Sequence, residues 1–399
     1  MSKPVGPDSS SREKSPGRVR ILTIFGTRPE AIKLAPVVHE IERHPESLEV
    51  RTVVSAQHRE MLDCVLELFD LVPDHDLNIM RAGQDLFDIT CHGLAGLKRV
   101  LKVESPDFVL VQGDTTTTLV GALGAHYFKI PVGHVEAGLR TRDRYHPFPE
   151  EINRQLVTVL SEIHFPPTRM SRANLLAEGV PEGRILVTGN TVVDALLAIA
   201  SRAPKHHDES LEPFGRSKRM ILVTAHRRES FGGPMREMFT AFQEVAKRHP
   251  DVEIVYPVHL NPNVLGPARE ILGGQERIHL IVPQPYDQFV HLMKRAHLIL
   301  TDSGGIQEEA PALGKPVLVM RETTERPEGI EAGTVKLVGT SARSIQSSVA
   351  RLLTDGDEYH RMATATNPYG DGHASRRIVD WILSNVRRPE AATLRPVGS

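Results

Sequence analysis

The chain has 399 residues, which is enough for two domains of ordinary size. Its 48 basic and 50 acidic residues nearly cancel, so bulk charge gives no reason to expect binding to nucleic acid or to a membrane. Only two cysteines occur, Cys64 and Cys91, without a CxxC motif, which argues against a disulfide framework or a zinc site. Residues 1–18 are polar and lack the apolar core of a signal peptide, and no apolar run reaches transmembrane length. We therefore expect a cytoplasmic protein with a disordered N-terminal tail.

Strand-like and helix-like segments alternate along the chain, which predicts parallel sheets covered by helices on both faces. In the first half, strands are expected at 20–25, 48–55, 107–112, 131–135, 162–165 and 184–188. Helices are expected at 30–43 (interrupted at Pro36), 59–69, 86–103, 117–128, 149–160, 168–178 and 192–201.

A polar stretch containing two prolines, 202–219, is the best linker candidate. Beyond it, strands are expected at 220–224, 253–258, 278–282, 296–300, 317–320 and 335–338. Helices are expected from Pro234 and at 287–295, 306–313, 341–353, 358–363 and 375–386. We therefore predict two doubly wound Rossmann-like α/β domains. The N-terminal domain is 19–201, completed by a C-terminal helix at 375–387, the C-terminal domain is 220–374, and 388–399 is a flexible tail.

Ligands of parallel sheets bind beyond the carboxyl ends of the strands, so the loops that follow strands are the informative ones. Asp302-Ser303-Gly304-Gly305 leads from an apolar strand into a helix N-terminus and suits an anion, although an ordinary strand-to-helix turn has the same form. Arg28 and Lys33, at the start of another helix, are suited to neutralising a diphosphate. The alternative is that they belong to an ordinary helix cap exposed to solvent.

Acidic and imidazole groups follow other strands. Asp114 and Glu136 are candidates for acid or base chemistry, although Asp114 is also a natural helix cap. Glu150 opens a helix whose dipole it would complement in any case. His226, beside two arginines, fits a site that handles phosphate and protons, with a stacked structural histidine as the alternative. The chain lacks the GxGxxG and GxxxxGK[ST] fingerprints and metal-ligand spacing, so we expect neither a cofactor nor a metal.

The motifs as a set resemble the non-hydrolysing UDP-N-acetylglucosamine 2-epimerase family over about residues 20–386. The ten motifs, in order, are GTRPEAIKLAP, QHREMLD, GDTTTT, GHVEAGLRT, PEEINR, TGNT, TAHRRES, PVHLNPNV, DSGGIQEEAP and RETTERPEGIEAGT. The resemblance implies the GT-B architecture, in which two Rossmann-like domains face each other across a cleft. It also implies a homodimer and a reversible conversion of UDP-GlcNAc to UDP-ManNAc, which supplies ManNAc for bacterial cell-surface polysaccharides.

The resemblance also implies roles for individual residues. Positions matching the catalytic residues are Asp114, Glu136, Glu150 and His226. Positions matching the UDP-binding residues are Arg28, Lys33, Gln284, Phe289, Ser303, Gly304, Gly305, Glu309 and Arg326. Positions matching the allosteric UDP-GlcNAc site of some members are Gln57, His58, Gln84, Glu151, Arg227 and His259. Glu60 and Gly83 depart from the regulated pattern, which usually has glutamine and arginine there.

Without a nicotinamide, the configuration at C2 of a sugar nucleotide can be inverted in two steps. UDP is first eliminated to leave a 2-acetamidoglucal, and it is then added back with the proton on the opposite face of C2. This route needs a stabilised leaving group and acid/base groups about C2. The alternatives are a GT-B UDP-sugar glycosyltransferase, a hydrolysing 2-epimerase that releases ManNAc and UDP, and a non-catalytic sugar-nucleotide sensor.

Overall fold

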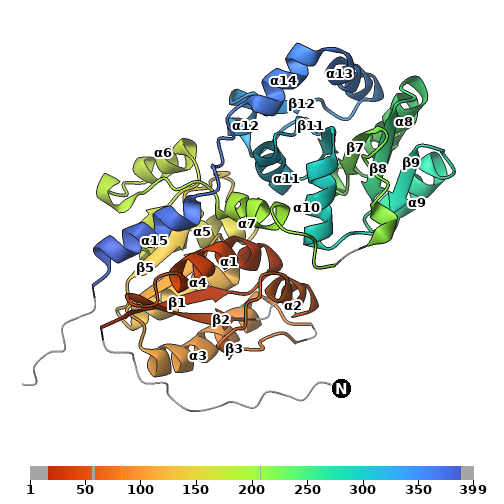
Figure 1. Cartoon of the computed structure of the whole chain (residues 1–399). Helices are drawn as coiled ribbons and strands as arrows, with labels where there is room; N and C mark the ends of the chain where they lie inside the picture. Colours follow the sequence, from red (N-terminus) through yellow and green to blue (C-terminus); the bar gives the residue numbers. More distant parts are fainter. Residues whose placement is uncertain (1–16, 56–58, 82, 207, 388–399) are drawn as a thin grey trace, which may run out of the picture. The chain divides into compact units, whose positions relative to one another are not determined.

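The computed structural model describes residues 17–55, 59–81, 83–206 and 208–387 (Figure 1). The chain divides into two compact units, the first comprising residues up to Thr188 and those from Ser375 onward, the second comprising Gly189–Ala374. Most of the expected N-terminal tail (1–18) and all of the expected C-terminal tail (388–399) lie outside the described residues. Each unit contains one parallel six-stranded sheet, so the predicted pair of doubly wound α/β domains is confirmed.

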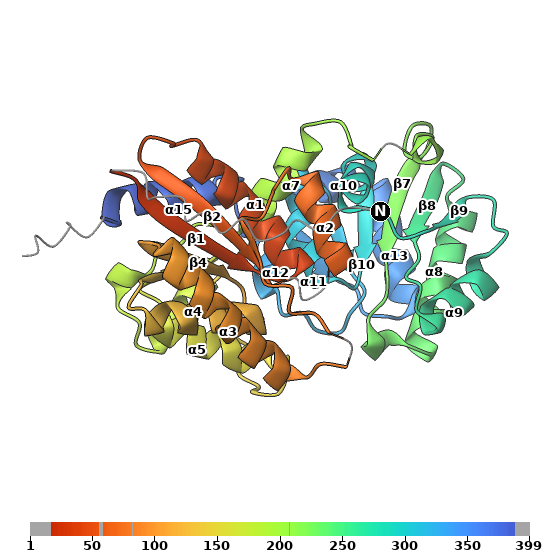
Figure 2. The same ribbon diagram turned by 90° about the horizontal axis from the view of Figure 1, so that it is seen from below.

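The first sheet has the strand order β3-β2-β1-β4-β5-β6. Its strands are β1 (Val19–Phe25), β2 (Leu48–Val54), β3 (His75–Asp76), β4 (Phe108–Gln112), β5 (Val132–Val135) and β6 (Ile163–Phe165). The helices are α1 (Arg28–Glu42), α2 (Arg59–Leu68), α3 (Leu86–Glu104), α4 (Thr116–Tyr127), α5 (Glu150–Leu160), α6 (Arg169–Ala177) and α15 (Ala374–Asn385). Figure 2 shows α3, α4 and α5 on one side of the sheet, with α1 and α15 on the other. Helices on both faces explain why these strands are continuous apolar runs.

Helix α1 runs through Pro36, so the predicted interruption is wrong. A proline inside a helix costs about 3 kcal/mol because it removes one backbone hydrogen bond and crowds the preceding turn. Burial of the apolar side chains on α1 outweighs that cost; they are Ala31, Ile32, Leu34, Ala35, Val37, Val38 and Ile41. The helix begins with a capping box between Thr27 and Glu30.

The expected strand at 184–188 is also wrong. A 3₁₀ turn at Glu182–Arg184 is followed by a single bridge between His164 and Ile185. The chain continues alongside β6 with one backbone bond from Leu186 to His164 and one from Thr188 to Pro166. A longer ladder does not form because Pro166 and Pro167, directly after β6, have no N–H to donate.

The second sheet has the order β12-β11-β10-β7-β8-β9. Its strands are β7 (Arg219–Thr224), β8 (Val252–Pro257), β9 (Ile278–Ile281), β10 (Leu298–Thr301), β11 (Val317–Val319) and β12 (Val335–Leu337). The helices of this unit are α7 (Thr191–Ala200), α8 (Gly233–Arg248), α9 (Pro262–Leu272), α10 (Tyr286–Arg295), α11 (Gly304–Glu309), α12 (Pro327–Glu331), α13 (Ala342–Thr354) and α14 (Gly356–Thr364). Fully buried Phe239, Phe242 and Tyr256 anchor its core. The sequence pattern did not predict β3, α9 or α12.

Helix α7 belongs to the second unit, although from the sequence it is expected at the end of the first domain. It is apolar on most sides and packs against α10 and α11. The side-chain amide of Asn190, its N-cap, donates to Glu308 at 2.6 Å. The expected linker, 202–219, also packs on this unit: Leu211 is buried, and its carbonyl accepts a hydrogen bond from Arg295 at 2.9 Å. The boundary between the two units, at Thr188, is therefore determined by long-range packing and not by a polar stretch of sequence.

Both sheets change winding direction at their middle strands. In the first sheet β1 lies between β2 and β4, and in the second β7 lies between β8 and β10. The loops that leave β1, β4, β7 and β10 therefore leave at switch points, where doubly wound sheets bind ligands. Within the described residues, none of the helices combines the length and apolarity needed to cross a bilayer.

Candidate active site

At the switch point of the first unit, the loops that follow β1, β2 and β4 are tightly packed. Gly26, directly after β1, has no side chain, and an added Cβ would lie 2.0 Å from Ser55 Oγ and 2.5 Å from Thr117 Oγ1. Those two hydroxyls are hydrogen-bonded to each other at 2.9 Å. The glycine is needed here for close approach, which brings the loops after β1, β2 and β4 together.

Glu136, at the end of β5, is the central acid of this unit. Its backbone is left-handed, with φ at 63°, an unusual conformation for a residue other than glycine and one that often marks a functional position. Lys33 Nζ lies 2.5 Å from one carboxylate oxygen and 2.6 Å from the other, and the Gln112 amide donates to the same carboxylate. From the sequence, Lys33 is expected to neutralise a diphosphate, whereas in the structure its ammonium is bound to a candidate catalytic acid.

Asp114 lies next to this group. Its carboxylate is 2.5 Å from Arg154 Nη2, and its backbone carbonyl accepts from the Asn153 side chain at 3.0 Å. Burial raises the pKa of Asp114, Arg154 opposes the rise, and the negative charge of Glu136 adds to it. Burial and the neighbouring negative charge therefore favour the protonated form of Asp114 more than solvent would.

The other acids of α5 differ from each other. Glu150 is half-exposed at the first position of the helix, and its carboxylate has no recorded partner among the described residues. Glu151 is fully buried and accepts hydrogen bonds from the N–H groups of Thr141 and Arg142, both at 3.0 Å. Burial raises the pKa of Glu151, but these bonds and the charge of Arg154 outweigh that effect and lower it. The carboxylate of Glu151 is therefore held by its own domain.

Arg28 and Gln84 are the remaining predicted residues of the first unit that the structure describes. Arg28 is half-buried at the start of α1, and no partner of its guanidinium is recorded within the described part of the chain. The Gln84 side chain accepts from the Arg81 N–H at 2.7 Å and donates to the Ile79 carbonyl at 2.8 Å, which folds its own loop. Gln57 and His58 lie outside the described residues.

In the second unit, Asp302 organises the switch point. It is fully buried after β10, and its Oδ2 accepts from the N–H groups of His226 and Arg227 at 2.6 and 2.7 Å. Its other oxygen lies 3.4 Å from His226 Nδ1. The His226 ring stacks on His259, with centroids 5.6 Å apart. Burial lowers the pKa of His226, Asp302 opposes this, and the neighbouring His259 and Arg227 add to it, so the neutral imidazole is favoured.

The loop from Ser303 to Gly305 lies beside this histidine loop. Ser303 is the N-cap of α11, but its hydroxyl makes no capping bond. A Cβ on Gly304 would lie 3.6 Å from Arg227 Nη2 and 4.0 Å from the Arg326 guanidinium carbon, so two cations flank the turn. Arg326 is paired with the buried acid Glu308.

The three other predicted residues of this unit lie on and around α10. Buried Glu309 accepts from the Tyr286 hydroxyl at 2.6 Å. Phe289 is half-buried on α10, and the Gln284 amide donates to the Val282 carbonyl at 2.8 Å.

Four residues that support the predicted site are not themselves predicted from the sequence. Gln112, Arg154 and Glu308 contact predicted residues directly, and Glu30 contacts Thr115 in the loop that carries Asp114. Three of them stand inside motifs quoted above, so a signal was present, but their partners are distant in sequence. Gln112 ends a strand and carried no signal of its own.

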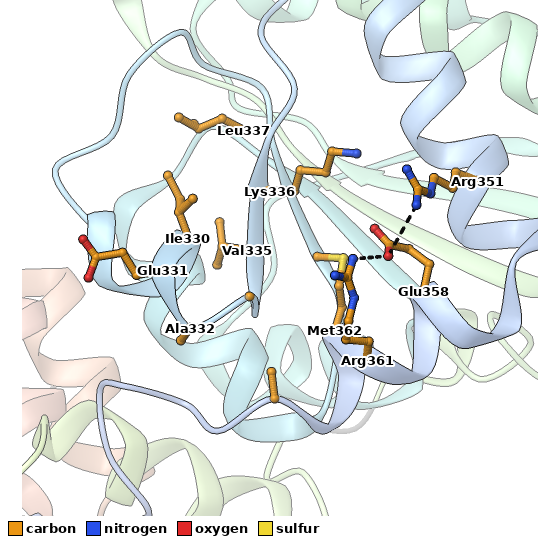
Figure 3. Close-up of a pocket in the computed structure, with 12 residues that line it drawn as sticks. Ile330, Glu331, Ala332, Val335, Lys336, Leu337, Arg351, Glu358, Arg361 and Met362 are labelled. Atoms are coloured by element: carbon orange, nitrogen blue, oxygen red, sulfur yellow. Dashed lines mark hydrogen bonds and ion pairs between the residues drawn. The ribbon is translucent and has the colours of Figure 1, made fainter.

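A hollow of about 650 Å³ lies elsewhere in the second unit, beside the edge strand β12 (Figure 3). Ile330, Val335 and Met362 form its apolar part, while Glu358 is neutralised by Arg351 and Arg361. None of the predicted site residues lines it. Among the residues that the structure describes, no group of three His, Cys, Asp or Glu side chains is arranged to hold a metal ion.

Comparisons with known proteins identify the family of this chain. The family model described as UDP-N-acetylglucosamine 2-epimerase matches residues 39–383. The UDP-N-acetylglucosamine 2-epimerase of Yersinia pestis is 58% identical in an alignment of 367 residues that covers 90% of this chain and 97% of that protein. The protein of the same name from Bacillus subtilis is 52% identical, over 92% of this chain and 95% of that protein.

Solved structures give the same result. The UDP-GlcNAc 2-epimerase of Neisseria meningitidis, bound to UDP-GlcNAc, is 49% identical with a TM-score of 0.81 over 92% of this chain and 100% of that one. A glycotransferase of kitacinnamycin, 14% identical with a TM-score of 0.64, shares the fold alone over 93% of this chain and 100% of that one. This chain therefore belongs to the UDP-N-acetylglucosamine 2-epimerase family.

Proposed function

We propose that this epimerase is of the non-hydrolysing type and interconverts UDP-GlcNAc and UDP-ManNAc. UDP leaves as the C2 proton is removed, which gives a 2-acetamidoglucal, and UDP then adds back with a proton delivered to the opposite face of C2. The bond between C1 and the diphosphate oxygen breaks and re-forms, so no oxidant and no net water are consumed. The relative from Methanocaldococcus jannaschii solved with UDP-GlcNAc and UDP supports this choice of ligands.

The observation that carries the proposal is the pairing of Asp114 and Glu136 in one polar cluster. A base that removes the C2 proton needs a pKa raised toward neutrality, and burial together with the Glu136 charge raises that of Asp114. Glu136, held by Lys33, is positioned as a second proton carrier. Glu150 and His226 complete the proposed catalytic set.

The proposed role of the second unit is to hold the leaving group. Ser303, Gly304 and Gly305 present a turn flanked by the cations Arg227 and Arg326, and a diphosphate needs such neutralisation as it departs. We assign the uridine and ribose to Gln284, Phe289 and Glu309, and we assign Arg28 and Lys33 of the first unit to the diphosphate. Lys33 then has two partners, Glu136 and the leaving group, which would link departure of UDP to proton transfer.

We also propose the set Gln57, His58, Gln84, Glu151, Arg227 and His259 as a regulatory site for a second UDP-GlcNAc. Glu60 and Gly83, which depart from the regulated pattern, weaken that activation. The formal net charge of −2 supports a protein that does not bind nucleic acid. We place the enzyme in the cytoplasm, as a homodimer, in the supply of ManNAc for cell-surface polysaccharides.

The test is to incubate the enzyme with UDP-GlcNAc alone in D₂O and follow the products by NMR. The expected result is UDP-ManNAc, with deuterium at C2 of both epimers. Release of free ManNAc and UDP would instead indicate the hydrolysing type, and a requirement for an acceptor would indicate a glycosyltransferase. Binding without exchange at C2 would indicate a sensor.

Variants of the three carboxylates separate chemistry from binding. Asp114→Asn, Glu136→Gln and Glu150→Gln should each retain UDP binding while losing about 10²–10⁴-fold in turnover, the usual cost of one positioned acid or base. Equal loss of UDP binding in all three variants would make these residues structural and contradict their assigned roles.

A further inference from the structure

Glu30 is a buried acid, outside the proposed catalytic set, that ties two switch-point loops together. Its side chain is only 2% exposed. One carboxyl oxygen, Oε2, accepts from the backbone N–H groups of Gly26 and Thr27 at 3.0 and 2.7 Å. The other, Oε1, lies 2.6 Å from Thr115 Oγ1 and 3.0 Å from Thr118 Oγ1. The residue thus spans the loop that leads to Lys33 and the loop that carries Asp114.

If Glu30 is a carboxylate, the hydroxyls of Thr115 and Thr118 have fewer protons than their oxygen contacts need. Thr118 Oγ1 lies 2.6 Å from the Gln112 carbonyl, which can only accept, so the single Thr118 proton goes there. The contact of Thr118 Oγ1 with Glu30 Oε1 then has no proton from the threonine. The Thr115 proton already serves its own shorter contact with Oε1. Thr115 Oγ1 also lies 3.1 Å from Thr118 Oγ1. With a proton on Oε1, Glu30 donates to Thr118, Thr118 to Gln112, and Thr115 to Glu30. Only the longest of these contacts, the one between the two threonine hydroxyls, is then left without a proton.

Two of the three charged side chains nearest to Glu30 along the packed segments are bound to other residues. These three are Arg28 and Lys33 on α1 and Asp114 ahead of α4, while Glu40 and Glu42 lie further along α1. Lys33 lies against Glu136 and Asp114 against Arg154. Burial raises the pKa of Glu30, and its contacts with Thr115, Thr27, Gly26 and Thr118 only partly oppose the rise. A neutral acid in this position agrees with the geometry.

We propose that Glu30 is a protonated carboxylic acid that acts as a positioning residue, fixing the loop before α1 against the loop before α4. This inference rests on the proposed function for its kinetic consequences, because the two loops carry Lys33 and Asp114. A carboxylate here would lack one hydrogen bond and repel the Thr118 lone pairs. A shorter or missing side chain would release the loops, and misplacement by about 1 Å typically costs about 10²-fold in rate.

The test compares Glu30→Gln with Glu30→Ala in the full-length enzyme. Glutamine can direct its oxygen to the two N–H groups and its NH₂ to the two threonines. The NH₂ cannot accept the Thr115 proton, which instead turns to Thr118 Oγ1, 3.1 Å away. Glutamine therefore satisfies the same groups as the neutral acid. Glu30→Gln should keep kcat within about threefold of the wild type, with an unchanged pH profile, and Glu30→Ala should lose about 10²-fold. A glutamine variant as weak as the alanine variant would overturn the proposal.

Two further measurements keep the test decisive if Glu30→Ala fails to fold. Thr118→Val removes the acceptor of the proposed proton and should lose activity, and Thr118→Ser should restore it. The control is Thr90→Val, which removes only a bond to the Leu86 carbonyl in α3. Activity unaffected by Thr118→Val would contradict the network.

The protonation state is measurable without any activity. In enzyme with ¹³C-labelled glutamate, infrared difference spectra of wild type minus Glu30→Gln should contain the carbonyl band of a protonated carboxylic acid. A carboxylate doublet in its place would overturn the proposal. Since this readout needs no substrate, it separates failure of this inference from failure of the proposed epimerase activity.

Discussion

The side chains of the candidate site are held in position by specific partners. Arg154 is an example, because it binds two acids, Asp114 and Glu151. It pairs with Asp114 through Nη2 at 2.5 Å and lies 3.3 Å from Glu151 through Nη1. Glu151 in turn accepts backbone N–H groups from the loop at Thr141 and Arg142. The position of Asp114 is therefore determined by a buried chain of charges that ends on the backbone.

Arg154→Met tests this arrangement through pH. Because the arginine opposes the rise in the pKa of Asp114, its removal should raise that pKa further. If Asp114 acts as a carboxylate, the acidic limb of the kcat/KM profile should move to higher pH. On that limb activity should fall about tenfold for each pH unit of displacement. Arg154→Lys keeps a charge and should move the limb less. A limb at the same pH in Arg154→Met would show that Asp114 does not set it.

In the first unit, some helices and loops pack closely at glycines, because the missing side chain lets two backbone segments approach each other. Gly138, after β5, has a φ of 88°, and a Cβ there would lie 2.3 Å from the Ser171 carbonyl of α6. A backbone atom cannot rotate away as a side chain would. Gly179, after α6, has nearly the same φ, 84°, but open space around it.

This pair separates backbone strain from collision. Gly179→Ala should cost about 1–2 kcal/mol of unfolding free energy, the penalty of a left-handed conformation for an L-residue. Gly138→Ala should cost that amount and about 1–3 kcal/mol more for overpacking. Denaturant unfolding followed by the fluorescence of Trp381, the chain's single tryptophan, would report on the first unit. Equal losses in both variants would mean that α6 shifts to accommodate the methyl group.

Across the whole molecule, the chain leaves the first unit at Thr188 and returns at Ser375. The returning helix α15 completes the first core, where Trp381 packs against Phe108 and Phe165 with ring centroids 6.1 and 5.8 Å apart. Ile382, on the same helix, is fully buried. The last residues of the described chain therefore stabilise the domain that begins it.

Ile382→Ala should lower the stability of the first unit by about 2–5 kcal/mol, the usual cost of a cavity left by a buried aliphatic side chain. The neighbouring Leu383, 37% exposed, provides the matched control, and Leu383→Ala should cost far less. Trp381 fluorescence again follows the transition. Similar losses from both substitutions would indicate that α15 is not an integral part of this core.

The alternation of apolar and amphipathic segments was sufficient to predict two doubly wound domains, because that pattern is local and repeats along the whole chain. It also placed polar loops at strand ends, and ten motifs in order were sufficient to suggest the family. Local polarity misplaced the domain boundary and a strand, because helix α7 is held by packing and the ladder beside β6 is limited by two prolines.

Only the tertiary structure decided which polar side chains meet. Lys33 and Glu136 are 103 residues apart, Asp114 and Arg154 are 40 apart, and Glu30 and Thr118 are 88 apart. No local periodicity encodes such pairs, since they depend on the order in which parallel strands lie side by side. The residues suited to the chemistry were thus recognisable from the chain alone, whereas the pairing that sets their protonation states results from the folded sheet, through burial and proximity.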